Sequence, residues 1–363
     1  MYEGWITPQP IIDLDIVERN IAAMAKRLKE HGISHRPHIK SSKSVLLARK
    51  QLAAGATGIT ASKLSEAEVF VDAGISNILI AYSIIGEVNL KRFAQLHGRA
   101  ELLTTVDSLS GAEGLARVGL ESGKPVRVLV EVDGGLHRGG RQPGEDAASF
   151  AKTVHAMEGL EVKGVMNYAG TIYKNTTRQG FSDAVTAEAA LLKETVTRMK
   201  AYDVPVDIVS SGSTPSALFC DLLQGVTEVR AGNYIFFDAS GVGMGLAAES
   251  DCALRVLATV ISVPLPGLAT MDAGTKTLTS DKAHGRSGYG IVVGRPGIEI
   301  SGLNEEHGFL AFDPAKEHLA VGDRIEIIPN HSCVIPNLCN EIQGVRKGEA
   351  AEVISIDARG CSY

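Results

Sequence analysis

The segment VRVLVEVDGGLHRGG, residues 126–140, carries the pattern that decides the fold. It begins with a run of β-branched and apolar residues, Val126 to Val132, and ends in a glycine-rich turn that contains Arg138. Apolar residues at helical spacing follow at Phe150 and Val154. This order predicts a buried strand, a loop and an amphipathic helix.

The same unit recurs on both sides of this segment. The eight strand-like runs are Arg36 to Lys40, Gly58 to Ala61, Ile78 to Tyr82, Glu101 to Thr105, Val126 to Val132, Lys163 to Tyr168, Val206 to Ser210 and Glu228 to Tyr234. Strands that alternate with helices form parallel sheets, and eight such units predict a closed (β/α)8 TIM barrel. An earlier strand, Ile11 to Leu14, and a helix, Ile16 to Leu28, are surplus to the eight.

The helical periodicity ends near Gly241. Beyond it, apolar runs separated by Gly, Pro and Asp turns predict strands, at Val256 to Val263, Gly290 to Val293, Ile298 to Ile300 and Arg324 to Ile328. We therefore expect a barrel over residues 13–240 and a β-domain over residues 241–363, joined by residues 1–12.

Composition excludes several classes of function. The 363 residues include 36 Lys and Arg against 42 Asp and Glu, a net charge of −6 that gives no footprint for nucleic acid or for an anionic membrane. No apolar run is long enough to span a bilayer, and the first ten residues lack the pattern of a secretory signal. We expect a cytoplasmic protein with five reduced cysteines and a small-molecule substrate.

Reactive residues follow the predicted strands, where barrel enzymes place their active sites. Lys40 ends the first run, so it is either an amine that faces the barrel mouth, available for Schiff-base chemistry, or a solvated surface lysine. Arg138, in the loop after the fifth strand, suits an anionic oxygen such as a phenolate or carboxylate.

Two turns predict a phosphate site. The turn after the seventh strand contains Gly212, Ser213 and Thr214 and leads into a helix, and the turn after the eighth contains Gly232, Asn233 and Tyr234. A lone Ser-Gly-Ser turn is more often a helix cap, but phosphate sites recur after strands seven and eight of barrels. An amine, a phosphate cradle and an arginine together are what pyridoxal phosphate requires.

These motifs resemble a known family. RPHIKSSKS, EVDGGLHRGG, VMNYAGTIY, VSSGSTPSAL, EVRAGNYIFFD, DAGTK, EEHGFL and IPNHSC occur in the order of the fold-type III pyridoxal phosphate enzymes related to alanine racemase, in the group of D-serine dehydratase and D-threonine aldolase. The resemblance implies an imine between Lys40 and the cofactor and places Arg138 at the phenolic oxygen. It also implies that Tyr168 or Tyr173 lies near the ring or the substrate, and that the two turns hold the phosphate.

His331 and Cys333 form a His-x-Cys pair that has two interpretations. A buried thiol beside a histidine is the commoner one, whereas imidazole and thiolate together suit Zn²⁺. The resemblance favours the second, because the group places a metal at this motif, with Cys on the dehydratase side and Asp on the aldolase side.

The resemblance implies an ammonia-lyase, a dehydratase dependent on pyridoxal phosphate and zinc, that converts a β-hydroxy D-amino acid of the D-serine or 3-hydroxyaspartate type to a keto acid and ammonia. It also implies a homodimer. Three alternatives stay open: a metal-dependent aldolase of the D-threonine or 3-hydroxyaspartate type, an amino-acid racemase, and a non-catalytic carrier of vitamin B6. Ser42 weakens the aldolase, because many aldolases have histidine at this position.

Overall fold

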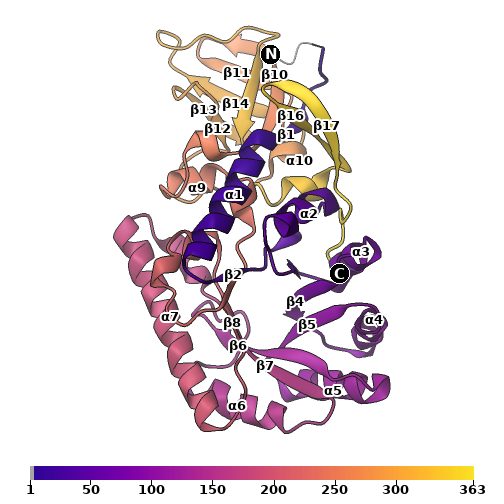
Figure 1. The fold of residues 1–363 in the computed structure, drawn as a ribbon. Helices are drawn as coiled ribbons and strands as arrows, with labels where there is room; N and C mark the ends of the chain where they lie inside the picture. The colour runs from indigo at the N-terminus through magenta and orange to yellow at the C-terminus, as the bar shows by residue number, and fades with distance from the viewer. Residues whose placement is uncertain (1–3) are drawn as a thin grey trace. The chain divides into compact units, whose positions relative to one another are not determined.

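The computed structural model describes residues 4–363, and the chain divides into two compact units (Figure 1). The barrel unit comprises residues 23–40, 47–232 and 361–363. The β-unit comprises residues 4–22, 41–46 and 233–360. A division by compactness does not decide where folding domains begin, so the expected boundary between residues 240 and 241 stays a prediction.

The barrel unit is built on eight parallel strands, which confirms the predicted fold class. They are β2 (Ser34–His35), β3 (Ile59–Ala61), β4 (Asn77–Ser83), β5 (Glu101–Val106), β6 (Val126–Asp133), β7 (Leu160–Tyr168), β8 (Ile208–Ser211) and β9 (Glu228–Val229). Their order in the sheet is β2-β9-β8-β7-β6-β5-β4-β3, so each strand from β4 to β8 lies between the strands that precede and follow it in the sequence. A single parallel bridge between His38 and Thr60 joins the two ends, and the Thr60 N–H donates to the Pro37 carbonyl at 2.8 Å.

Helices follow the strands on the outside of the sheet (Figure 1). They are α2 (Val45–Ala53), α3 (Leu64–Asp72), α4 (Glu87–His97), α5 (Leu109–Ser122), α6 (Glu145–His155), α7 (Arg178–Ala201) and α8 (Thr214–Leu218). Four consecutive strands, β4 to β7, each contribute one residue to a buried apolar cluster, namely Leu79, Leu103, Leu129 and Met166. Burial of this cluster favours the closed, strand-by-strand order.

The first and last strands of the barrel are shorter than the sequence predicts. The run Arg36 to Lys40 lies outside the strand: β2 ends at His35, and the run then turns through a 3-10 helix, η1 (Ile39–Ser41). Pro37 interrupts the ladder because it has no N–H to donate. The run Glu228 to Tyr234 ends as a strand at Val229 and continues into η4 (Asn233–Ile235).

The β-unit is a mostly antiparallel sheet with nine strands in the described chain. They are β1 (Gln9–Asp13), β10 (Leu254–Leu265), β11 (Leu268–Met271), β12 (Ile291–Val292), β13 (Ile298–Leu303), β14 (Gly308–Phe312), β15 (Arg324–Ile328), β16 (Glu341–Arg346) and β17 (Glu349–Ser355). The main order is β13-β14-β11-β10-β1-β16-β17, and β15 pairs with both β10 and β12. Two short helices, α9 (Ala239–Gly243) and α10 (Thr275–Leu278), belong to the same unit.

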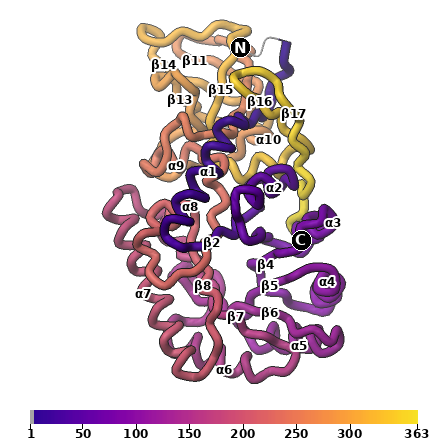
Figure 2. Tube along the Cα trace, viewed as in Figure 1, coloured from indigo at the N-terminus to yellow at the C-terminus, as the bar shows by residue number. Residues whose placement is uncertain are grey.

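The N-terminal strand is a central member of this sheet. Ile11 of β1 pairs antiparallel with Arg255 of β10 and parallel with Gln343 of β16. Figure 2 shows the indigo N-terminal trace among the orange and yellow strands. The helix α1 (Leu14–Glu30) follows. The surplus N-terminal strand of the sequence thus belongs with the C-terminal strands. Within residues 4–363 no helix is both long and apolar enough to cross a membrane.

Candidate active site

Lys40 lies just beyond the first barrel strand, in the middle of η1. Its side chain is exposed, whereas its neighbours Ile39 and Ser41 are buried. The bridge between His38 and Thr60 and the 3-10 turn fix the backbone on both sides of the lysine. An exposed side chain on a fixed backbone suits an amine that must reach a ligand.

Three cations of the barrel unit act on His38. Burial lowers the pKa of His38 well below its usual value, and the charges of Lys40, Arg230 and Arg138 lower this pKa further. The imidazole is therefore neutral at physiological pH. Its Nδ1 is buried without a hydrogen-bond partner among residues 4–363. The sequence placed Lys40 and Arg138 together; the structure adds Arg230 to them.

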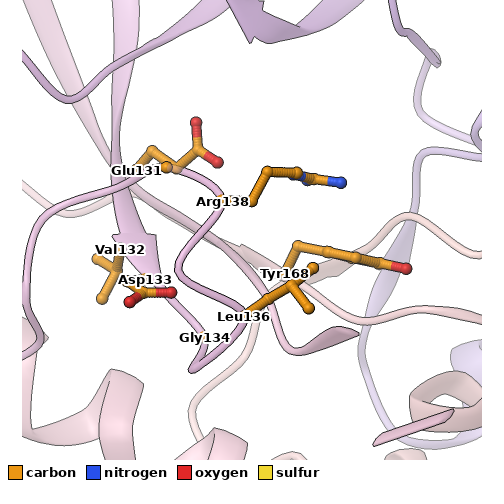
Figure 3. A pocket seen from close by; sticks show the side chains of 8 residues that line it. Glu131, Val132, Asp133, Gly134, Leu136, Arg138 and Tyr168 are labelled. Carbon is orange, nitrogen blue, oxygen red and sulfur yellow. The ribbon is translucent and has the colours of Figure 1, made fainter. Parts of the chain in front are cut away.

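A pocket lies at the carboxyl end of β6 and β7 (Figure 3). It is lined by Glu131, Val132, Asp133, Gly134, Leu136, Arg138, Gly139 and Tyr168. The guanidinium carbon of Arg138 lies 4.9 Å from the centroid of the Tyr168 ring, and the two side chains extend in the same direction. Of the two candidate tyrosines, the structure brings Tyr168 to this pocket. Tyr173 is half-buried five residues further on, in the 3-10 helix η2 (Gly170–Lys174).

The loop that carries Arg138 is held at both ends by carboxylates. Asp133, the last residue of β6, accepts hydrogen bonds from the backbone N–H groups of Gly135 and His137, both at 3.0 Å. Asp107 accepts one from Gly140 at 3.0 Å. This glycine-rich loop is thus fixed by its own backbone, and the arginine that it carries is directed toward the pocket.

The turn after β8 is held by a residue that the sequence did not indicate. Glu188, in the middle of α7, is buried and accepts hydrogen bonds from the Gly212 N–H at 3.0 Å, from Ser216 Oγ at 2.9 Å and from Ser211 Oγ. Burial raises the pKa of Glu188. Gly212 has φ +84°, and a Cβ there would lie 3.1 Å from Val229. The Gly212 N–H is therefore committed to Glu188, while Ser213 and Thr214 begin α8.

The turn after β9 contains a buried arginine that sequence reasoning missed. Arg230 donates to Ser210 Oγ at 2.8 Å and to the Asn167 carbonyl at 2.6 Å. Its charge opposes the rise that burial and Asp107 cause in the pKa of Glu131. Its position could have indicated it, because Arg230 directly follows β9, where barrel enzymes place site residues. The prediction for this turn instead relied on Gly232.

The remaining residues of that turn have other partners. Asn233 donates from Nδ2 to Asp238 at 2.8 Å, and its Oδ1 accepts from Ser332 Oγ at 2.5 Å. Tyr234 is almost fully buried. The side chain of Asn233 therefore contacts the loop that carries His331 and Cys333, and its predicted phosphate contact would use the backbone.

The His-x-Cys loop follows β15 in the β-unit. Nδ1 of His331 lies 2.7 Å from Asp281 Oδ2, and Ser41 Oγ lies 3.0 Å from Cys333 Sγ. A hydrogen bond to Cys333 raises the pKa of His331 to about 10, and Asp281 contributes in the same direction. The imidazole and the thiol thus converge. Within residues 4–363 there is no group of three or more His, Cys, Asp or Glu side chains that could hold a metal ion.

Two protein-family models match this chain, one over most of the barrel unit and one over part of the β-unit. A family model described as alanine racemase, N-terminal domain, matches residues 12–240, and a model for a serine dehydratase domain matches residues 253–345. D-threo-3-hydroxyaspartate dehydratase of Delftia sp. (strain HT23) is 40% identical over 346 residues, 90% of each chain. D-threonine aldolase of Arthrobacter sp. is 32% identical over 361 residues, 98% of this chain and 93% of the aldolase.

The chain belongs to the alanine racemase-like family of D-serine dehydratases and D-threonine aldolases. This confirms the resemblance carried by the motifs. The solved structure of the Delftia dehydratase superimposes with a TM-score of 0.90 at 36% identity, covering 97% of both chains. Solved structures of that dehydratase include a histidine mutant and a cysteine mutant in the metal-free form, and the two mutated residues are two positions apart. His331 and Cys333 have the same spacing in this family member.

Proposed function

We propose that this chain is a dehydratase, dependent on pyridoxal phosphate and a divalent metal, that converts a β-hydroxy D-amino acid into a keto acid and ammonia. The observation that carries the proposal is that one chain contains both a candidate cofactor lysine and a candidate pair of metal ligands. The barrel unit presents the amine of Lys40 among cations beside a neutral histidine, and the β-unit presents an imidazole beside a thiol. The relative named D-threo-3-hydroxyaspartate dehydratase supports this reading.

The residues of the barrel unit fit pyridoxal phosphate. Lys40 would hold its aldehyde carbon, Arg138 its phenolic oxygen, and the turns at Ser213 and Gly232 its phosphate. The buried, unbonded Nδ1 of His38 within the described chain and the cations around it suit an anionic, ring-shaped ligand. When bound, pyridoxal phosphate supplies an electron sink for the bonding pair released at the substrate's Cα.

Lys40 is also the proposed base. Its amine would accept the proton from Cα, because an amine freed next to that carbon lies within proton-transfer reach. Arg138 would keep its charge throughout and would orient an anionic oxygen, with the ring of Tyr168 beneath the guanidinium limiting its movement. Arg230, which is held by Ser210 and Asn167, would add a fixed positive charge to the same end of the barrel.

His331 and Cys333 fit a borderline-soft metal, and we propose Zn²⁺. A neutral imidazole and a thiolate are ligands that zinc prefers, and both side chains retain solvent access. A metal at this position would act as a Lewis acid on the departing β-hydroxyl. The cysteine mutant of the Delftia relative, solved in the metal-free form, supports this assignment.

The proposed reaction is balanced without a further reactant. The Cα–H and Cβ–O bonds break, hydroxide leaves with one proton as water, and hydrolysis of the resulting enamine consumes one water and yields the keto acid and ammonia. An aldolase would instead break the Cα–Cβ bond and yield glycine and an aldehyde. This is the second candidate, because a D-threonine aldolase aligns with 98% of the chain.

One assay separates the candidates. The purified holoenzyme is incubated with D-serine, D-threonine and both 3-hydroxyaspartate diastereomers, and keto acid, ammonia and glycine are measured together. We expect keto acid and ammonia in equal amounts from at least one substrate, with D-threo-3-hydroxyaspartate the first candidate. Glycine without keto acid would show an aldolase. Inversion at Cα without either product would show a racemase, and no turnover of any kind would favour a carrier of vitamin B6.

We further propose that the enzyme acts in the cytoplasm as a homodimer. Within residues 4–363 none of the five cysteines is in a disulfide, which agrees with a reducing compartment. Sedimentation analysis at working concentration should give twice the mass of one chain. A single-chain mass would contradict the dimer and leave the assigned reaction unaffected.

A further inference from the structure

The two metal-ligand candidates, His331 and Cys333, each contact one polar side chain from another part of the β-unit. Asp281, between α10 and β12, places Oδ2 2.7 Å from His331 Nδ1. Ser41, in η1, places Oγ 3.0 Å from Cys333 Sγ. Neither partner belongs to the His-x-Cys loop, and neither is a ligand candidate in the motif itself.

The carboxylate of Asp281 is oriented by its own backbone. Its N–H donates to Thr279 Oγ1 at 3.2 Å, and its carbonyl accepts from Asn330 Nδ2 at 2.9 Å. Asn330 directly precedes His331, so the carboxylate and the imidazole are fixed to the same short stretch. A histidine whose Nδ1 is bonded to a carboxylate has only Nε2 left to bind a metal.

Ser41 differs from Asp281 in burial. Its side chain is almost fully buried, and the sulfur that it contacts is half-buried. A thiolate carries no proton, so in the metal-binding form of Cys333 the hydroxyl of Ser41 must be the donor. A hydrogen bond to a metal-bound sulfur restrains its position and lowers the charge that it presents to the metal.

The loop between the ligands has its own support. Ser332 donates its N–H to the buried carboxylate of Asp238 at 3.0 Å and its hydroxyl to Asn233 Oδ1. Asp238 also accepts the Gly241 N–H at 3.0 Å. The loop backbone is therefore held without Asp281 and Ser41, and substitution of these two should act on the ligand atoms rather than on the loop.

We propose that Asp281 and Ser41 are the positioning residues of the metal site: Asp281 selects Nε2 of His331 as the ligand atom, and Ser41 fixes the thiolate of Cys333. The inference rests on the proposed function, because it takes His331 and Cys333 as the ligands. Outer partners of this kind change metal affinity by roughly 10–100-fold in other proteins.

The experiment measures Zn²⁺ affinity in the holoenzyme, loaded with pyridoxal phosphate and stripped of metal, by competition with a chromogenic chelator. Asp281→Ala and Ser41→Ala should each bind zinc roughly 10–100-fold more weakly than the unmodified chain. Asp281→Asn retains an acceptor oxygen and should recover part of the loss. With Co²⁺ in place of zinc, Ser41→Ala should shift the sulfur-to-metal charge-transfer band, whereas Asp281→Ala should leave this band in place.

Matched controls are available in the same unit. Asp313 has a carboxylate as exposed as that of Asp281 (49% against 46%) and pairs with Lys316, so Asp313→Asn should bind zinc normally. Ser44 is a buried serine whose hydroxyl has no hydrogen-bond partner in the described part of the chain, so Ser44→Ala controls for loss of a buried hydroxyl. Cofactor absorbance and the melting temperature verify that each variant is folded.

Two further variants separate this inference from the proposed function. If His331→Ala and Cys333→Ala lose zinc while Asp281→Ala and Ser41→Ala bind it normally, the positioning roles are wrong and the metal site stands. If zinc binds equally to all four variants, the metal site at His331 and Cys333 is itself wrong. Weaker binding in Asp281→Ala and Ser41→Ala, with unchanged controls, supports the positioning roles.

Discussion

Single residues at the end of the barrel concentrate positive charge around an imidazole that stays neutral. Lys40, Arg230 and Arg138 all lower the pKa of His38, and its burial lowers this pKa most. A cationic histidine would compete with Lys40 for the anionic groups of a ligand. Because the imidazole is neutral, the positive charge stays on the long side chains of Lys40, Arg138 and Arg230, which can reach such a ligand.

The first prediction concerns the cofactor lysine. Lys40→Ala should abolish both turnover and the visible absorbance of bound pyridoxal phosphate, because the imine requires this amine. Lys63, which directly precedes α3 and lies with Nζ 3.6 Å from the centroid of the Tyr82 ring, is the control. Lys63→Ala should keep its colour. A Lys40→Ala protein that keeps the visible band after dialysis would remove the cofactor assignment.

The second prediction concerns pH and stability. Burial lowers the pKa of His35 to about 4 in the folded state, against 6.5 when exposed. Between pH 6.5 and 4 the unfolded chain therefore binds a proton that the folded chain does not. The free energy of unfolding should fall as pH falls through this window, by up to about 3 kcal/mol from this residue, and His38 acts in the same direction.

His35→Gln is the variant that checks this account. The glutamine amide can still donate to the Ala231 carbonyl, which His35 Nε2 approaches at 3.1 Å, but it does not titrate. Urea unfolding at pH 7 and pH 5 should show a smaller loss of stability in the variant. An equal loss in both proteins would show that His35 is not the titrating group.

Several candidate site residues could be identified from the sequence because they lie at the carboxyl ends of predicted strands. Lys40 and Arg138 follow strand-like runs, so the barrel rule alone places them at the mouth. Arg230 and Glu188 were missed because their roles depend on burial and on partners far away in the sequence. Glu188 is in the middle of a helix, where the sequence indicates only an amphipathic surface.

Among the elements, α7 and the turn after β8 depend on each other. Glu188 of α7 is the acceptor for Ser211, Gly212 and Ser216, and all three donors are buried or lie in a buried turn. Removal of this acceptor would leave the Gly212 N–H without its partner, while Ser211 and Ser216 would keep only their longer contacts, to Asn167 Oδ1 at 3.5 Å and to Ser213 Oγ at 3.3 Å. Each unsatisfied buried group costs about 1–3 kcal/mol.

The third prediction follows from this arrangement. Glu188→Ala should lower the free energy of unfolding by about 1–3 kcal/mol and weaken the binding of pyridoxal phosphate, because the turn proposed to hold the phosphate loses its support. Chemical unfolding and absorbance titration of the cofactor-free protein measure the two effects. Glu188→Gln retains an acceptor and should bind the cofactor nearly as well as the unmodified chain.

Glu194, on the exposed side of the same helix, is the matched control. Its ion pair with Arg198 is solvent-exposed, so Glu194→Ala should change stability by less than about 1 kcal/mol. If Glu188→Ala and Glu194→Ala bind the cofactor equally well, the support for the turn does not come from Glu188.

The elements themselves were largely predictable, with an instructive exception. Six of the barrel strands follow their apolar runs closely because burial on both faces requires such runs. The first and last strands of the barrel in the sequence, β2 and β9, are two residues long. There each predicted run continues into a turn, and apolar character alone does not distinguish a strand from a buried turn. β11, β14, β16 and β17 were not predicted, since none has more than two β-branched residues in succession.

For the molecule as a whole, the proposed cofactor lysine and metal ligands belong to separate units. The fourth prediction is that chelation stops turnover and leaves the cofactor's visible absorbance in place, because imine formation needs no Lewis acid but departure of hydroxide does. Zinc should restore activity better than magnesium, which gains little from a thiolate. Turnover that persists in Cys333→Ala with chelator present would exclude the zinc mechanism and favour a racemase.

The position of β1 has a consequence for synthesis of the chain. Ribosomes add roughly 5–20 residues per second, so β1 emerges on the order of tens of seconds before β10, the earlier-made of its two neighbours in the sheet. During that interval Ile11 and Ile12, both fully buried in the finished sheet, have no strand to join. The barrel strands β4 to β9 differ, since each can add to the one made just before it. Slow translation of the part of the message that precedes β10 would therefore prolong the exposure of one apolar strand to chaperones and to other nascent chains.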